Sequence, residues 1–272
     1  MAALTVVPRR SKARGHADLG WLNTYHTFSF ADYYDPQFME FGPLRVLNED
    51  RVKAKTGFGK HPHREYEIFS YILSGELEHR DSLGNVEILK RGDVQFTTAG
   101  SGITHSEKND HPNKTCHFLQ IWVKPDFAYL DPGYVTQTFS DANKTNRLLP
   151  IVSPYLDTTN APTDASSTTV LDNTIGVHTD LFTFACTLEP GQSVVHSVQS
   201  AHPNRKAKSS GNGARRLYLH VVDQTGAITI VDSNTTLQAG DGAFVTEVKS
   251  RQTLELSNPT SEKVEFLLFD MA

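Results

Sequence analysis

The sequence predicts an all-β protein with two similar antiparallel barrels, one in each half of the chain. Short runs of β-branched and aromatic residues recur along it, turn signals separate these runs, and no long amphipathic helical pattern interrupts them. The two halves also repeat one order of strands and glycine turns. A length of 272 residues favours two domains of similar size.

Six runs have the composition of strands, and turn sequences such as SLGN, KRGD and AGDG lie between them. They are EYEIFSYIL (65–73), DVQFTTA (93–99), TCHFLQIWV (115–123), RRLYLHVV (215–222), AITIVD (227–232) and VEFLLFD (264–270). Closely spaced short strands of this kind are typical of an antiparallel sandwich or barrel.

A degenerate internal repeat indicates where the two barrels lie. The segment LSGELEHRDSLGNVEILKRGDVQFT (73–97) resembles LHVVDQTGAITIVDSNTTLQAGDGAFVT (219–246), with GDV and GDG in corresponding places. The stretch between the halves, residues 124–166, is rich in Pro, Thr, Asn and Asp, which is the composition of a linker. We therefore expect an N-terminal domain over 1–135 and a C-terminal domain over 136–272.

Composition excludes several classes of function. A net charge of −5 and a pI near 6.2 argue against direct binding to nucleic acid. No stretch approaches the ~20 apolar residues of a membrane span, and the first residues lack the pattern of a secretory signal, so we expect a cytoplasmic protein. The five Lys and Arg residues of 202–216 are interpreted as part of a solvated loop.

Only two cysteines occur among 12 histidines, so any transition-metal site must rely on imidazole and carboxylate. Cys116 and Cys186 are expected to be buried thiols.

Two short motifs in the first half carry metal-ligand chemistry. His61 and His63 lie two residues apart in GFGKHPHREYE, and Glu107 lies two residues after His105 in GSGITHSEKND. In an extended strand residues i and i+2 share a face, so each pair has a chelating geometry. Either pair alone arises often by chance. Together on facing strands the two pairs would form a site of three nitrogens and one oxygen.

The flanking glycines match the two motifs of the cupin barrel, and the chain closely resembles the pirin family, whose members are bicupins. The matching stretches include RGHADLGWLNTYHTFSFADYYDP (14–36), FGPLRVLNEDRV (41–52), TGFGKHPHREYEIFSYILSGELEHRDSLGN (56–85), GDVQFTTAGSGITHSE (92–107) and FLQIWVKP (118–125). The resemblance implies two consecutive jelly-roll-type cupin barrels. It also implies that His61, His63, His105 and Glu107 bind one mononuclear metal.

The second half departs from this ligand pattern. PGQSVVHSV keeps the single histidine His196, and no histidine follows GDGAFVTE. We therefore expect the C-terminal barrel to be free of metal, with His196, His202 and His220 as structural or surface residues.

Several residues of the first half have more than one interpretation. Glu67 occupies a position where many cupins place a carboxylate ligand, but the pirin pattern uses Glu107, so we expect Glu67 to support the site or face the core. His26, His79, His111 and His117 are expected to be ordinary hydrogen-bonded histidines. Phe28, Phe30 and Tyr33 would suit either an aromatic-substrate pocket or a packed N-terminal segment.

The expected ligands favour iron, with manganese, nickel, copper and zinc as alternatives. Four protein ligands on a six-coordinate ion leave two positions for dioxygen and a substrate, which is oxygenase chemistry. The resemblance implies quercetin 2,3-dioxygenase activity, which opens a flavonol ring with loss of carbon monoxide. In that hypothesis Glu107 also accepts the flavonol hydroxyl proton.

Two other functions remain open. Other pirin-family members act in the nucleus as iron-dependent co-regulators that bind a transcription factor, and a third hypothesis is a structural or metal-storage bicupin without turnover. The motif residues do not discriminate between the dioxygenase and the co-regulator, because both need the same metal.

Overall fold

The computed structural model describes residues 4–156, 168–200, 214–222 and 224–272. Nearly all elements in this part of the chain are β-strands, and they form two units that each contain a seven-stranded and a four-stranded sheet. We call residues Arg14–Phe139 the N-terminal barrel. The C-terminal barrel comprises Met1–Ala13, Ser140–Leu156 and Thr168–Ala272. The prediction of an all-β bicupin is confirmed.

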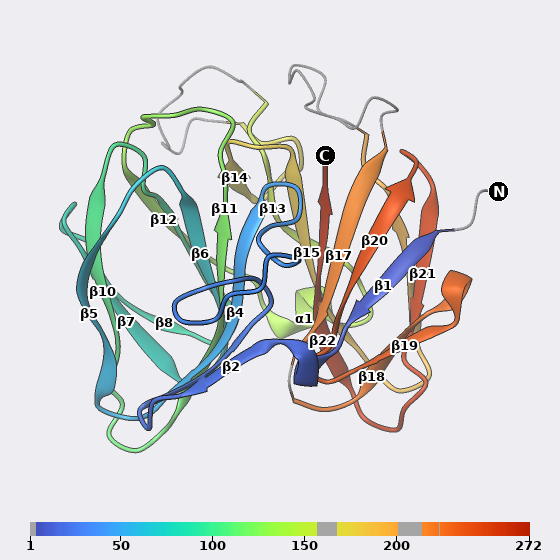
Figure 1. The fold of residues 1–272 in the computed structure, drawn as a ribbon, viewed down its shortest axis with the longest axis horizontal. Helices are drawn as coiled ribbons and strands as arrows, with labels where there is room; N and C mark the ends of the chain where they lie inside the picture. The colour runs from blue at the N-terminus through green and yellow to red at the C-terminus, as the bar shows by residue number, and fades with distance from the viewer. Residues whose placement is uncertain (1–3, 157–167, 201–213, 223) are drawn as a thin grey trace. The chain divides into compact units, whose positions relative to one another are not determined.

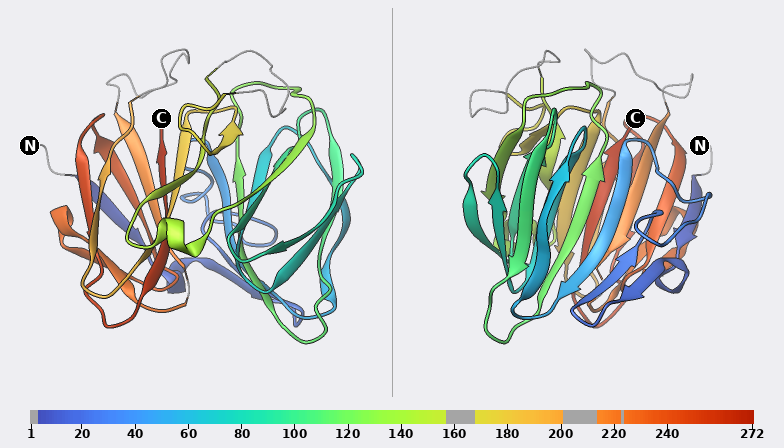
Figure 2. Two further views of the ribbon diagram at one scale, coloured as in Figure 1. Left: turned by 180° about the vertical axis from the view of Figure 1, so that it is seen from behind. Right: turned by 60° about the vertical axis from the view of Figure 1, so that its left-hand side comes forward.

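The N-terminal barrel has its two sheets face to face (Figures 1 and 2). The seven-stranded sheet has the order β12-β9-β6-β11-β4-β3-β2, and the four-stranded sheet has the order β5-β10-β7-β8. The strands are β2 (Gly15–Asp18), β3 (Leu22–His26), β4 (Leu44–Val52), β5 (Thr56–His63), β6 (Glu67–Ser74), β7 (Glu76–Asp81), β8 (Val86–Lys90), β9 (Asp93–Thr98), β10 (Ile103–Asn109), β11 (Cys116–Val123) and β12 (Gly133–Thr138).

The space between these two sheets is apolar at one end and polar further along. Phe118 of β11 and Ile72 of β6 belong to a buried core with Leu77 of β7. Because side chains alternate along a strand, Gln120 shares the face of Phe118, and Ser70 shares the face of Ile72. The same inward faces therefore pass from an apolar core to a set of polar groups.

The C-terminal barrel has sheets in the orders β1-β20-β17-β22-β15-β13-β14 and β16-β21-β18-β19. Its strands are β1 (Thr5–Arg9), β13 (Leu149–Pro154), β14 (Ile175–Val177), β15 (Leu181–Leu188), β16 (Ser193–Ser197), β17 (Arg215–Val221), β18 (Ala227–Ile230), β19 (Thr235–Gln238), β20 (Gly242–Val248), β21 (Thr253–Ser257) and β22 (Val264–Met271). Strand β1 pairs antiparallel with β20, so the first strand of the chain completes a sheet built otherwise from the second half.

The sheet orders of the two barrels correspond over their central strands. The run β9-β6-β11-β4 of the first barrel corresponds to β20-β17-β22-β15 of the second, and β5-β10-β7-β8 corresponds to β16-β21-β18-β19. The edge position that β12 fills beside β9 is filled by β1 beside β20. The repeat seen in the sequence is thus a repeat of strand topology.

Helical structure among the described residues is limited to short segments, namely α1 (Asp141–Lys144), the 3-10 turn η1 (Ser11–Ala13) and the 3-10 turn η2 (Val231–Ser233). None of the described helices has the length and hydropathy needed to span a bilayer. Cys116 and Cys186 are both free and buried, and burial raises the pKa of each thiol to about 12.

The basic segment 202–216 lies outside the described residues as far as residue 213. Its last two residues are not in a loop, because Arg215 and Arg216 begin β17. Arg215 is buried between Asp180 and Asp270, with ion-pair distances of 3.0 and 2.5 Å. The interpretation of the whole segment as a solvated loop is therefore wrong at this end, where two carboxylates compensate a buried guanidinium.

Candidate metal centre

Strand β10 lies between β5 and β7 and brings the predicted ligands together. His105 of β10 is directly opposite His61 of β5, and His63 is opposite Ile103. The antiparallel register between the two strands shifts at a bulge between His105 and Glu107. The two i, i+2 pairs predicted from the sequence therefore lie on neighbouring strands of one sheet, which Figure 1 shows side by side.

The turn before β10 fixes where the strand begins. Gly100 has φ +46°, and a Cβ atom built on it would lie 1.9 Å from the carbonyl oxygen of Leu130. The carbonyl oxygen of Gly100 accepts a hydrogen bond from the backbone N–H of Glu65. Only glycine tolerates this left-handed turn so close to another backbone, so Gly100 helps to fix the start of the strand that carries His105.

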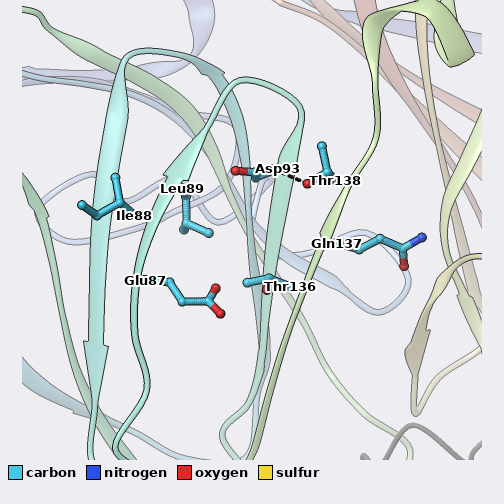
Figure 3. Close-up of a pocket in the computed structure, with 7 residues that line it drawn as sticks. All are labelled: Glu87, Ile88, Leu89, Asp93, Thr136, Gln137 and Thr138. Carbon is cyan, nitrogen blue, oxygen red and sulfur yellow. Dashed lines mark hydrogen bonds between the residues drawn. The ribbon is translucent and has the colours of Figure 1, made fainter.

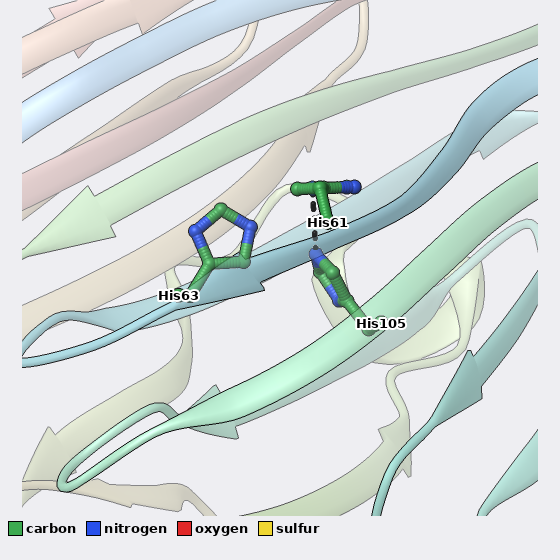
Figure 4. Close-up of side chains that lie close together, drawn as sticks. All are labelled: His61, His63 and His105. Carbon is green, nitrogen blue, oxygen red and sulfur yellow. Dashed lines mark hydrogen bonds between the residues drawn. The ribbon is translucent and has the colours of Figure 1, made fainter.

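The three histidines His61, His63 and His105 form a nearly regular triangle (Figure 4). Their ring centroids are 4.7 Å apart for His61 and His63, 4.6 Å for His61 and His105, and 4.7 Å for His63 and His105. One ring nitrogen from each lies within 4.8 Å of the other two. We call this set the three-histidine group.

Hydrogen bonds involve both ring nitrogens of His61 and leave the Nε2 atom of His63 without a partner. The Nδ1 atom of His61 donates to the carbonyl oxygen of Gly59 at 2.7 Å, so its Nε2 keeps a lone pair. That Nε2 is 3.1 Å from Nε2 of His105. The Nε2 atom of His63 is buried without a hydrogen-bond partner.

Two histidines of this group, His63 and His105, favour their neutral forms. Burial, followed by the nearby rings of His105 and His61, lowers the pKa of His63 to about 4. Burial is also the largest cause that lowers the pKa of His105. Neutral imidazole is the form that binds a metal, so the environment of the rings suits that task.

Glu107, the expected fourth ligand and catalytic base, is 1% exposed and is held by the facing sheet. Its Oε1 accepts hydrogen bonds from Gln95 Nε2 at 3.0 Å and from Ser70 Oγ at 3.2 Å. Its Oε2 accepts from Gln120 Nε2 at 2.9 Å. Amide nitrogens only donate, so this arrangement suits an ionised carboxylate.

The carboxylate of Glu107 forms a second group of ligand atoms with His79 and His105. We call these residues the inner group, because all three are buried, whereas His61 and His63 are partly exposed. Glu107 is directly opposite His79 of β7. Glu107 therefore lies beside His105, but its ligand atom is grouped with that of His79 and not with those of His61 and His63. The sequence analysis treated His79 as an ordinary histidine.

The spacing between His79 and Asp81 could have marked His79 as a candidate metal ligand. In HRD, Asp81 lies two residues after His79, which is the spacing that singled out the other pairs. The Nε2 atom of His79 is 3.0 Å from Oδ2 of Asp81. What the sequence does not indicate is that β7 pairs with β10 in a register that places His79 against Glu107.

Glu67 lies on the other face of the seven-stranded sheet. It is three residues from Ser70 on β6, and an odd spacing on a strand puts the two side chains on opposite faces. Thr98 Oγ1 donates to Glu67 Oε1 at 3.2 Å. Strand β5 ends at His63, and the backbone turns at Glu65, which has φ +64°. Glu67 therefore does not continue the strand that carries His63.

Aromatic side chains lie beside the three-histidine group. The ring of Trp122 is 4.9 Å from that of His63, edge to face, and Trp122 also contacts Phe30 at 5.6 Å and Tyr66 at 5.5 Å. Of the N-terminal aromatic residues that were expected to line a pocket or to pack, Phe30 reaches the site through Trp122. Phe28 is buried.

Three further histidines of this barrel have hydrogen-bond partners. His26 pairs with Asn48 at 2.8 Å, His117 pairs with Glu49 at 2.9 Å, and His111 Nδ1 accepts from the backbone N–H of Lys114.

The C-terminal barrel has different residues at the corresponding places. His196 of β16 is directly opposite Leu254 of β21, where the first barrel pairs His61 with His105. Leu254 and Val194 belong to a buried apolar cluster. His196 Nε2 pairs with Asp270 at 2.8 Å, and His220 is buried. His202 lies outside the described residues.

Figure 3 shows a pocket in the N-terminal barrel. It is lined by residues of β8, β9 and β12, namely Glu87, Ile88, Leu89, Asp93, Thr136, Gln137 and Thr138. Thr138 Oγ1 donates to Asp93 Oδ1 at 2.7 Å across one wall. None of its lining residues belongs to the three-histidine group or the inner group, so we do not assign it to the site.

Comparisons with known proteins point to one family. The family model named Pirin matches residues 7–123. A protein named quercetin 2,3-dioxygenase from Escherichia coli strain K12 is 35% identical over 263 residues, which cover 97% of this chain and 97% of that protein. The crystal structure of YhhW from Escherichia coli has a TM-score of 0.80 at 33% identity and covers 98% of each chain.

A crystal structure of the bacterial pirin YhhW from Escherichia coli in complex with nickel(II) is also similar. Its TM-score is 0.78 at 33% identity, with 98% of this chain and 99% of that chain covered.

Proposed function

Because the chain belongs to the pirin family, we propose that it is a metal-dependent dioxygenase of the quercetin 2,3-dioxygenase type, with His61, His63, His105 and Glu107 as its metal ligands. The observation that carries the proposal is the convergence of the three-histidine group, with His63 Nε2 buried and unpartnered. The 35% identity to a quercetin 2,3-dioxygenase supports the reaction type, and the nickel complex of YhhW supports a metal.

The convergence of the three-histidine group supports a single transition-metal ion. Two ligands each about 2.0–2.1 Å from one ion at a right angle are roughly 3 Å apart. The Nε2 atoms of His61 and His105 are 3.1 Å apart. Three imidazoles and a carboxylate suit iron, and they also accept manganese, nickel, copper or zinc. We propose iron as the resident ion, at one ion per chain.

When bound, such an ion supplies electron transfer between an aromatic substrate and dioxygen. In the overall reaction, one flavonol and one dioxygen give one carbon monoxide and a ring-opened product. The ring-opened product contains both atoms of the dioxygen. The part of Glu107 is to accept the proton of the flavonol hydroxyl, as a carboxylate that also binds the metal. The amide of Gln120, which donates to its Oε2, holds the side chain in place.

The aromatic side chains would orient a flat substrate beside the histidines. Trp122 stands edge-on to His63, and Phe30 and Tyr66 contact Trp122. Aromatic rings favour offset-stacked or edge-to-face contacts, which orient a planar ligand without charge. We therefore propose a small aromatic substrate that carries an ionisable hydroxyl.

The test is oxygen uptake by protein loaded with iron(II), manganese(II) or nickel(II). Flavonols should be consumed with release of carbon monoxide, whereas flavones without the hydroxyl should not react, because Glu107 then has no proton to accept. His105→Gln should abolish uptake, and His117→Gln should not, since His117 pairs with Glu49 outside both ligand groups. Failure of every metal with every flavonol would contradict the dioxygenase proposal and favour the metal-dependent co-regulator.

A further inference from the structure

The inner group of His79, His105 and Glu107 is a complete ligand set beside the three-histidine group. One ligand atom of each residue lies within 4.8 Å of the other two, and all three side chains are buried. We propose that this group is a second position for the metal ion, more deeply buried than the first and sharing His105 and Glu107 with the four ligands proposed above. The inference rests on the proposed function only in requiring that the N-terminal barrel binds a metal.

The hydrogen bonds of His79 leave one nitrogen free for a ligand. Its Nε2 is 3.0 Å from Oδ2 of Asp81, and a carboxylate accepts, so in the neutral ring Nε2 carries the proton and Nδ1 keeps the lone pair. That Nδ1 atom is buried without a hydrogen-bond partner. A carboxylate bonded to the far nitrogen of the ring is how metal-ligating histidines are commonly held.

The orientation of this ring is fixed from two sides. Asp81 accepts hydrogen bonds from Asn85 Nδ2 at 2.9 Å and from the backbone N–H of Leu83 at 2.9 Å. Tyr134 stacks on the ring of His79 with centroids 4.4 Å apart and an angle of 16° between planes. The side chain is therefore rigid before any ligand binds, which lowers the entropic cost of binding an ion.

The inner group has the chemistry of a known class of metal site. Two imidazoles and one carboxylate on one side of an ion, with open positions opposite, are typical of non-haem iron(II) oxygenases. Glu107 supplies the carboxylate, and its bonds to Gln95 and Gln120 hold it in place. An ion here would also satisfy the unpartnered Nδ1 of His79, whose burial without a partner is otherwise unfavourable.

The two positions are alternatives for one ion. A neutral imidazole has one nitrogen lone pair, so His105 can ligate a single ion at a time. The expected content therefore stays at about one metal per chain. Movement of the ion between the positions would exchange His61 and His63 for His79.

The experiment uses cobalt(II) as the probe and a variant that retains only the inner group. In the full-length protein, His61→Ala/His63→Ala should bind about one cobalt(II) per chain, with weaker affinity than the wild type and a different visible absorption spectrum. Adding His79→Gln should abolish that binding. Adding His117→Gln instead should leave it intact, because His117 is also buried and paired with a carboxylate in the same barrel but lies outside the inner group.

Circular dichroism and thermal unfolding should establish that each variant is folded before titration. The inference is overturned if the folded double variant binds no cobalt(II), or if its binding survives His79→Gln. If the wild type binds cobalt(II) and the double variant does not, the inner position is rejected and the proposed function is not. A wild type that binds none of the tested metals would reject the proposed function as well.

Discussion

His105 lies directly opposite His61, with their Nε2 atoms 3.1 Å apart, and it is the residue common to both ligand groups. It owes this position to β10, whose neighbours β5 and β7 carry the other histidines. One strand thus connects every residue that we expect to touch the metal.

We therefore expect His105→Gln to be more damaging than His61→Gln. Without His105 neither group is complete, so metal content after dialysis should fall from about one per chain to near zero. Without His61 the inner group remains, so affinity should fall but measurable binding should persist. Elemental analysis and calorimetric titration of the two variants measure this difference. Equal losses in the two variants would show that His105 has no such shared role.

Gln120→Leu should weaken the metal site without removing a ligand. Gln120 Nε2 donates to Glu107 Oε2 at 2.9 Å, and its loss leaves a buried carboxylate oxygen without that donor. Loss of such support typically costs about 10- to 100-fold in metal affinity. The free energy of unfolding should fall by about 1–3 kcal/mol. Gln192→Leu, at an exposed position of the other barrel, is the control and should change neither quantity.

Features with a local pattern could be predicted from the sequence. Alternation in strands and glycine turns predicted the all-β fold, and the i, i+2 spacing placed His61 and His63 together because a strand repeats every two residues. Features that depend on pairing between distant segments could not. The pairing of β1 with β20 and the register that sets His79 against Glu107 are examples.

Glu67 illustrates a second limit. Its distance from the histidines depends on a backbone turn at Glu65, a non-glycine residue with φ +64°. Glutamate has no special preference for that conformation, so nothing in the local sequence indicates the turn. The backbone N–H of Glu65 donates to Gly100, which is distant in sequence, and this contact accompanies the turn.

Asp50 should make the metal-free protein less stable at high pH. Burial, and then the neighbouring carboxylate of Glu107, raise the pKa of Asp50 from 3.8 to about 7. The folded state therefore holds a proton that the unfolded state releases, so stability falls as the pH rises from about 4 to about 7. The full cost above pH 7 is on the order of 4 kcal/mol.

Asp50→Asn removes this titration. Relative to wild type, the variant should gain stability as the pH rises through that window, and urea unfolding of metal-free protein between pH 4.5 and pH 8 measures the gain. Asp18→Asn, at the exposed end of β2, should show no such trend. A stability difference between Asp50→Asn and wild type that is independent of pH would mean that Asp50 ionises normally in the folded state.

Substitution by glutamine should affect one glutamate of the cupin motifs and not the other. In Glu107→Gln one carboxylate oxygen becomes an amide N–H₂ group, and whichever oxygen is replaced, that group faces the amide donor of Gln95 or Gln120. A buried pair of donors costs about 1–3 kcal/mol, and the charge that would bind the metal is lost. We expect Glu107→Gln to lower metal affinity and to abolish oxygenase activity.

Glu67→Gln should keep both properties. Its Oε1 accepts from Thr98 on the opposite face of the sheet, and a glutamine oxygen can accept the same bond. Iron content and oxygen uptake of the two variants, measured side by side, decide the assignment. If Glu107→Gln kept iron while Glu67→Gln lost it, Glu107 would not be the carboxylate ligand. Glu67 would then have to reach His63 from the opposite face of the seven-stranded sheet. Its position on β6 argues against that.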